Sequence, residues 1–215
     1  MNNSSQEHLE GLASLENINV EERAEQGRNH FLSGLNCAQS VVAAFSDLFP
    51  GADIDTALRM AASFGGGMGR MRMTCGAVSG LAMLAGLECG NADGDQQARA
   101  KNYALVQQLA AAFKEENDSL ICADLLGLRS GQIDPPRPSE RTAEYYRARP
   151  CPVLVASACR IYAQHLSKRE EVGEPALPGE NGSAHWLGAP RTAPSPAREL
   201  ARAARCRVAS GRRGQ

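Results

Sequence analysis

The chain of 215 residues lacks several features that mark common classes of protein. Its longest run of apolar and small residues, 77–87, is shorter than the ~20 residues that a helix needs to span a bilayer. A formal net charge of -1 provides no basic field for nucleic acid. The first residues, MNNSSQEHLEG, show no basic-then-apolar pattern, so we expect no secretory signal. These absences favour a soluble, cytoplasmic protein that binds no nucleic acid and has no membrane span.

Familiar cysteine and nucleotide motifs are also missing. No two of the seven cysteines form a C-x-x-C pair, which excludes a thioredoxin-like motif and the usual zinc-knuckle spacing. No G-K-[ST] follows the glycine-rich segment 65–69, so a phosphate loop is disfavoured. The odd number of cysteines and the expected reducing compartment argue against a full disulfide framework. A site shared by the cysteines must therefore assemble from distant segments.

Helical periodicity, with no alternating strand pattern, predicts an all-α fold. The segment 75–87 is apolar all round, which is typical of a central, buried helix. We therefore expect a compact bundle of about five to six helices around that segment. The other expected helices cover 20–32, 38–48, the segment from Asp53 to Gly65, a long segment with Tyr103, Val106, Leu109 and Phe113 on one face, 120–126, and a last helix that begins at Pro152 and has an apolar stripe of Val155, Cys159, Tyr162 and Leu166.

Composition divides the chain into three parts. Residues 1–18 are expected to be a flexible N-terminus and 19–170 a helical domain. Residues 171–215 are rich in Pro, Gly and Arg and poor in apolar residues, so a disordered tail is expected there. Trp186 and Cys206 lie in that tail and are discounted as site residues. The segment 131–150 is rich in proline and charge and is expected to be mostly loop, with a turn of helix around 143–146.

Four cysteines fall where the expected helices begin: Cys37, Cys75, Cys122 and Cys151. Thr74 is the expected cap of the buried helix, and Cys151 is the expected N-cap before Pro152. Helix N-termini carry unpaired N–H groups and a partial positive charge, which favour the thiolate form of a cysteine. The remaining cysteines lack this setting, because Cys159 lies in mid-helix, Cys89 at a helix C-terminus and Cys206 in the tail.

The same four cysteines carry a resemblance to a known family. A C-G-A-x-x-G run is formed by Cys75-Gly76-Ala77-Val78-Ser79-Gly80, and the glycine-rich segment Phe64-Gly65-Gly66-Gly67-Met68-Gly69-Arg70 precedes it. An earlier cysteine, Cys37, follows Ser33-Gly34-Leu35-Asn36, and two single cysteines, Cys122 and Cys151, come later. In this order they resemble the C_GCAxxG_C_C family, which is described as redox-active. The resemblance covers about residues 20–168 and implies that these four cysteines form the site, with Cys159 competing with Cys151 for the last position.

Several residues near the motif have alternative roles. Gly66, Gly67 and Gly76 could bring the backbone close to a cofactor, whereas Gly80 favours close helix packing. The methionines of the loop are either soft metal ligands or flexible fillers: Met68, Met71 and Met73. Arg70 and Arg72 could offset the charge of gathered thiolates, and His30 is an outside candidate for the site.

Three functions remain open at this point. The first is a redox protein, either an oxidoreductase or an electron carrier. Its four cysteines would cycle between thiol and disulfide or carry electrons: Cys37, Cys75, Cys122 and Cys151. The second is a protein that binds an iron–sulfur cluster or another thiophilic metal through the same four cysteines. The third is a non-enzymatic helical interaction module with buried structural cysteines. The sequence identifies neither a redox partner nor an oligomeric state.

Overall fold

A computed structural model describes residues 18–128 and 134–172 of the chain. The helices in these residues are α2 (Val20–Leu32), α3 (Cys37–Ala43), the 3-10 helix η2 (Ser46–Leu48), α4 (Ile54–Ala62), α5 (Gly76–Cys89), α6 (Gln96–Asn117), α7 (Cys122–Leu125), α8 (Ala143–Ala148) and α9 (Cys151–Val172). The prediction of an all-α fold is confirmed. The two described segments contain no strand, and their only bridge is an isolated antiparallel pair of Thr74 and Ile121.

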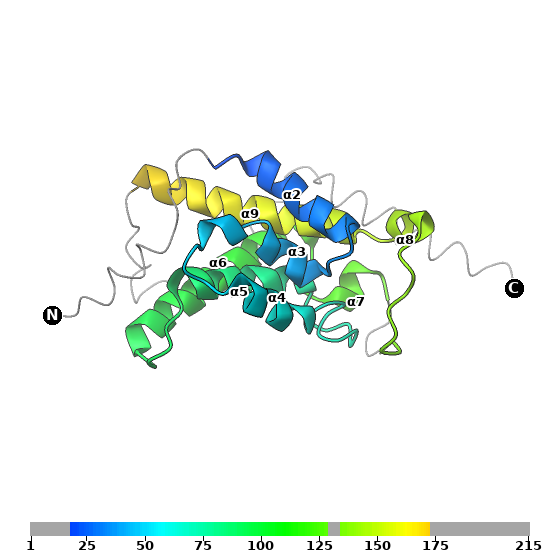
Figure 1. Cartoon of the computed structure of the whole chain (residues 1–215), viewed down its shortest axis with the longest axis horizontal. Helices are drawn as coiled ribbons and strands as arrows, with labels where there is room; N and C mark the ends of the chain where they lie inside the picture. Colours follow the sequence, from blue (N-terminus) through cyan, green and yellow to red (C-terminus); the bar gives the residue numbers. More distant parts are fainter. Residues whose placement is uncertain (1–17, 129–133, 173–215) are drawn as a thin grey trace, which may run out of the picture.

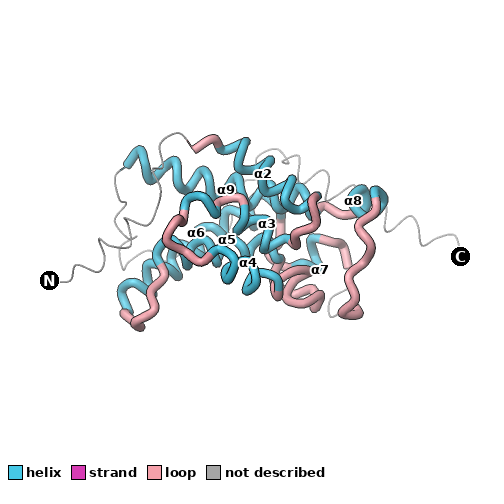
Figure 2. The backbone as a smooth tube through the Cα atoms, viewed as in Figure 1, coloured by secondary structure: helices cyan, strands magenta, loops and turns pink. Residues whose placement is uncertain are grey.

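The long helices form the body of the molecule. Helix α2 lies along α9, and α5 packs against α3, α6 and α9 (Figure 1). The loops that follow α4 and α7 gather at the same end of the body as α8 (Figure 2). Among the described helices, none is both long and apolar enough to cross a membrane.

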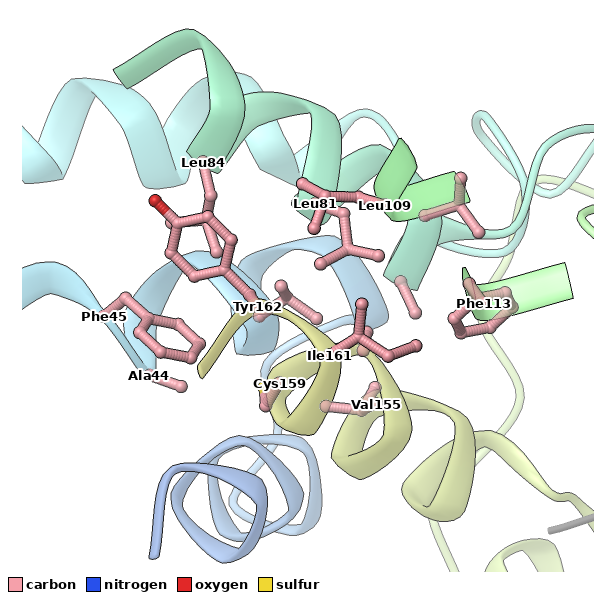
Figure 3. Packing of buried hydrophobic residues seen from close by; sticks show 14 of the residues in the cluster. Ala44, Phe45, Leu81, Leu84, Leu109, Phe113, Val155, Cys159, Ile161 and Tyr162 are labelled. Carbon is pink, nitrogen blue, oxygen red and sulfur yellow. The ribbon is translucent and has the colours of Figure 1, made fainter. Parts of the chain in front are cut away.

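The core lies between α5, α6 and α9, as expected for the helix that is apolar all round. Leu81 and Leu84 of α5 meet Leu109 and Phe113 of α6 in one buried cluster. The predicted stripe of α9 is fully buried: Val155, Cys159, Tyr162 and Leu166. Figure 3 shows Val155, Cys159 and Tyr162 among the packed side chains of this cluster. The stripe thereby fixes how α9 sits in the body.

Glycines bring α3 close to the start of α5. A Cβ atom at Gly80 would lie 2.7 Å from the Cβ of Val41 and 3.0 Å from the carbonyl oxygen of Ala38. A Cβ at Gly76 would lie 3.0 Å from the Cβ of Cys37. Both contacts are closer than packed side chains tolerate, so the absence of a side chain at these positions allows the helices to approach. The packing role expected for Gly80 is found, and Gly76 shares it.

Two local predictions were wrong. The expected helix over 38–48 ends as α3 at Ala43, and a separate 3-10 turn, η2, follows it. Tyr103 is 59% exposed, because the buried face of α6 follows the i, i+4 row of Leu105, Leu109 and Phe113, which lies on another side of the helix. Within the described residues, seven α-helices accompany the central α5, where about five to six were expected, and α7 and α8 are the shortest of them.

A buried carboxylate joins α5 to α9. Glu88 accepts hydrogen bonds from the Tyr162 hydroxyl at 2.8 Å and from Arg169 Nη1 at 2.5 Å, and it contacts His165 Nε2 at 2.9 Å. Burial raises the pKa of Glu88, but the neighbouring His165 and Arg169 outweigh it and leave the pKa below its ordinary value. The buried carboxylate of Glu88 is therefore compensated by hydrogen bonds and by positive charge from α9.

The close contact of α2 with α9 gives a first prediction. A Cβ at Gly27 would lie 2.3 Å from the Sγ of Cys159, so Gly27→Ala should lower the free energy of unfolding by about 1–3 kcal/mol. In a Cys159→Ala background the same change should be stabilising, because the sulfur is gone and alanine is the better helix former. Urea unfolding of the four proteins measures both effects. The same sign in both backgrounds would contradict the packing role of Cys159.

Candidate cysteine site

The four sequence-predicted cysteines line one cavity. It has a volume of about 510 Å³ and lies at the end of the body where α8 and the loops gather. Its walls come from the end of α2, the starts of α3, α5 and α9, the loop after α4, α7, and the segment 136–149. Apolar side chains form part of the wall, including Phe31, Leu125 and Leu154. Segments that are far apart in sequence thus converge on one space.

Each of these cysteines occupies a helix N-terminus, as predicted. Cys37, Cys122 and Cys151 are the first residues of α3, α7 and α9, and Cys75 is the N-cap of α5. Two details of the prediction were wrong. The cap of α5 is Cys75 because Thr74 pairs with Ile121 in the bridge. Helix α9 begins one residue early, since the carbonyl of Pro150 accepts hydrogen bonds from the N–H groups of residues 153 and 154.

The isolated bridge fixes the spacing of Cys75 and Cys122. The N–H of Cys75 donates to the carbonyl of Leu120 at 2.8 Å, and the N–H of Cys122 donates to the carbonyl of Met73 at 2.6 Å. The two cysteines follow the bridged residues Thr74 and Ile121 directly. The backbone therefore sets their relative position before any side chain contributes.

The glycine-rich loop follows a left-handed path. Positive φ angles occur at five consecutive positions and again at Arg72: Gly66 (66°), Gly67 (71°), Met68 (56°), Gly69 (56°), Arg70 (69°) and Arg72 (63°). Such angles are costly for residues with a side chain and free for glycine. Gly66, Gly67 and Gly76 all line the cavity. Their expected role in binding a cofactor remains a prediction. The positive φ angles of Gly66 and Gly67 and the close contact of Gly76 with Cys37 of α3 are structural reasons for glycine at these positions.

A buried arginine connects the loop to a cysteine. Arg72 is 4% exposed, and its Nη1 donates to the Sγ of Cys122 at 3.8 Å. On its other side it forms an ion pair with Asp134, to which Arg70 also donates at 3.3 Å. The sequence-based interpretation of these arginines as partners of thiolates thus has a contact to support it at Arg72.

Cys37 and Cys151 interact directly through their thiols. A hydrogen bond with the Cys37 thiol lowers the pKa of Cys151, and the positive charges of Arg149 and Arg72 lower it further against the effect of burial. The same hydrogen bond, together with burial, raises the pKa of Cys37 well above its usual range. Of the two thiols, Cys151 is therefore the one whose surroundings favour the thiolate.

The other two cavity cysteines are held as thiols. Burial and the neighbouring Cys122 raise the pKa of Cys75 to about 12. Burial also raises the pKa of Cys122, although its hydrogen bond with Arg72 acts in the opposite direction. All four cysteines are free, with no disulfide among them. Cys151 is the one cavity cysteine whose environment favours the thiolate.

The remaining candidates lie away from the cavity. Of the two candidates for the last cysteine position, Cys151 lines the cavity and Cys159 does not. Cys159 packs against Gly27 of α2, and burial raises the pKa of Cys159 to about 12. His30 is half-buried on α2 and does not line the cavity. The loop methionines do not line it either and are 40–52% exposed, so they do not serve as fillers: Met68, Met71 and Met73. Cys206 and Trp186 lie outside the described residues, as do 1–17 and 173–215.

Sequence reasoning missed two arginines and a tyrosine in the cavity wall. Arg149 stacks over the ring of Tyr145, with 4.9 Å between the guanidinium carbon and the ring centroid. Arg141 donates to the carbonyl of Phe31 at 2.7 Å. The position of Arg149, two residues before Cys151, is a signal that could have been used. Arg141 gives no such signal, because only the fold brings it near α2.

Metal ligation was the second function considered for the four cysteines. Within the described residues, no group of three or more His, Cys, Asp or Glu side chains is arranged to hold a metal ion. The four thiols thus share a cavity without forming a preorganised coordination shell.

Fold and site together define a small all-α protein with a cysteine-lined cavity. The chain belongs to the C_GCAxxG_C_C family, whose model, described as "Putative redox-active protein (C_GCAxxG_C_C)", matches residues 35–165. The resemblance expected from the sequence is thereby confirmed. No curated protein and no solved structure matches the chain.

Proposed function

We propose that the protein is a thiol–disulfide redox protein in which Cys151 and Cys37 are the active dithiol. The observation that carries the proposal is that Cys37 and Cys151 line one cavity at the starts of α3 and α9, where the hydrogen bond between their thiols lowers the pKa of Cys151 and raises that of Cys37. A thiolate is the attacking species in disulfide exchange, and a second thiol within reach completes the exchange. The membership of the chain in a family described as redox-active supports the same chemistry.

The helix that begins at Cys151 adds to this assignment. Helix α9 has 22 residues, so its N-terminus carries the full partial positive charge of a long helix. Arg149 and Arg72 add positive charge near the same sulfur. Cys75 and Cys122 have raised pKa values, so we do not expect them to start the exchange at neutral pH. The predicted cytoplasmic location suits a dithiol that cycles transiently.

Mapping the first disulfide formed tests the proposal. Protein reduced and handled without oxygen is treated with a small disulfide for short times, alkylated, digested and analysed by mass spectrometry. We expect a link between Cys37 and Cys151 to accumulate first, and to form equally in a Cys89→Ser control, since Cys89 lies at the far end of α5. A first link that involves Cys89 or Cys159, or four cavity thiols that never oxidise, would contradict the proposal.

The second candidate is ligation of an iron–sulfur cluster or another thiophilic metal by Cys37, Cys75, Cys122 and Cys151. The observation in its favour is that all four line one cavity, with arginines nearby to offset thiolate charge. The same anaerobic preparation distinguishes it, because a coloured protein with bound metal and four unreactive thiols supports ligation. An interaction module would instead keep its cellular function when all four cysteines are replaced by serine.

A further inference from the structure

The cavity wall is unusually rich in positive charge. Four arginines line it: Arg70, Arg72, Arg141 and Arg149. Among the described residues no aspartate or glutamate lines the cavity. Within the described segments, the one carboxylate that pairs with this set is Asp134, which Arg70 and Arg72 share. The walls therefore carry more positive charge than the neighbouring carboxylate neutralises.

Two of these arginines, Arg141 and Arg149, form no ion pair with an aspartate or glutamate of the described residues. Arg141 donates to the carbonyl of Phe31 and stacks on its ring, with 4.7 Å from the guanidinium carbon to the ring centroid. Arg149 stacks over Tyr145. Within the described part of the chain, no ion pair is formed by either side chain. These contacts orient the two guanidinium groups, and among the described residues the hydrogen bond to Phe31 uses only part of the five N–H donors of Arg141, which leaves donors for an anion.

We propose that the cavity binds a small anionic disulfide, with its carboxylates on Arg149 and Arg141, as the oxidant of the Cys37–Cys151 pair. This substrate class rests on the proposed function. The volume of about 510 Å³ suits a small molecule, and the apolar side chains of Phe31, Leu125 and Leu154 suit its methylene groups. Arginine is the side chain best matched to a carboxylate, because its planar fork donates two parallel hydrogen bonds.

The exchange between the bound disulfide and the two cysteines proceeds in two steps. The Cys151 thiolate attacks one sulfur of the bound disulfide, which forms a mixed disulfide and releases the other half as a thiolate that takes up a proton. The Cys37 thiol then loses its proton and attacks the Cys151 sulfur, which forms the Cys37–Cys151 disulfide and releases the second half as a thiol. The protein dithiol is oxidised by two electrons, and the substrate disulfide is reduced to two thiols. Excess small thiol reverses both steps.

Three disulfides of similar size and different charge provide the kinetic test: dithiodiglycolate (dianion), bis(2-hydroxyethyl) disulfide (neutral) and cystamine (dication). We expect the dianion to oxidise the reduced protein about tenfold faster than the neutral compound and the dication to be slowest. Arg149→Gln should bring the ratio of dianion to neutral rate close to one. This ratio is unaffected by a change in the thiolate fraction of Cys151, because both rates depend on it equally. Arg147→Gln, a control on the exposed side of α8, should keep the ratio.

A non-exchanging dianion separates binding from redox chemistry. Calorimetry with thiodiglycolate, a thioether, should show binding to the reduced protein that is lost in Arg149→Gln and kept in Arg147→Gln. Equal rates with all three disulfides, or no binding of thiodiglycolate, would overturn the anion proposal while leaving the redox function standing. Binding of thiodiglycolate without oxidation by any disulfide would support the anion site and overturn the redox function.

Discussion

Cys151→Ser is expected to reduce the rate at which the protein reacts with a small disulfide by more than about 100-fold, because a serine hydroxyl is not ionised and does not attack sulfur. The loss should be specific to this position. Cys89→Ser leaves both members of the proposed pair in place, so its rate should match that of the unaltered chain. Stopped-flow measurement of thiol release under pseudo-first-order conditions gives the rates. A Cys151→Ser rate within a few-fold of the unaltered chain would show that another cysteine starts the reaction.

Two substitutions at Cys37 separate its proposed roles. Cys37→Ser keeps a hydrogen-bond donor beside Cys151 but removes the second nucleophile, so the first step should stay fast and the mixed disulfide should accumulate. Cys37→Ala removes the donor as well, so the pKa of Cys151 should rise and the first step should slow at neutral pH. In each variant, mass spectrometry detects the trapped mixed disulfide.

The pH dependence of the first step tests whether Cys37 lowers the pKa of Cys151. The rate of the first step should rise with pH as Cys151 ionises and level off above its pKa, which in the unaltered chain is lower than the ordinary value of a cysteine thiol. Cys37→Ala should move the midpoint to higher pH, whereas Cys37→Ser should leave it close to its original position. A midpoint that is the same in all three proteins would show that Cys37 does not tune Cys151.

Much of this site was accessible from the sequence because helix starts leave local signals. Asn36 caps α3 through a capping box with Gln39, and Pro152 marks the start of α9, so Cys37 and Cys151 could be assigned to helix N-termini. The convergence of those starts on one cavity could not be derived in the same way. It depends on how α2, α3, α5 and α9 pack, and helix periodicity describes each helix alone.

The charge of the cavity depends even more on tertiary structure. Arg141 lies in a segment that sequence analysis assigned to loop, and only the fold places its guanidinium against Phe31. The pairing of Cys37 with Cys151 likewise joins residues more than a hundred positions apart. Tyr103 shows the opposite error, since it was placed on one apolar face with Leu109 and Phe113, which are buried, whereas Tyr103 itself is 59% exposed. Local pattern thus indicates which residues begin a helix, whereas burial and charge environment come from contacts between helices.

The glycine-rich loop provides the second large effect. Gly67→Ala is expected to lower the free energy of unfolding by about 2–5 kcal/mol, from about 1–2 kcal/mol for a side chain at positive φ and about 1–3 kcal/mol for overpacking. The overpacking follows from the geometry, because the added Cβ would lie 2.6 Å from the Cβ of Cys122 and 2.9 Å from the N of Met73. The loop and the cysteine segment cannot both keep their positions.

Gly69→Ala is the matched control for this substitution. Gly69 also has a positive φ, of 56°, but a Cβ there meets nothing within 4 Å, so only the backbone cost of about 1–2 kcal/mol should appear. The difference between the two variants in urea unfolding therefore measures the contact of the loop with Cys122. Because Cys122 is 7% exposed, its alkylation should also be faster in Gly67→Ala than in Gly69→Ala. Equal stability and equal alkylation of the two variants would show that the loop does not press on Cys122, and Gly67 would then be a glycine for its backbone angle alone.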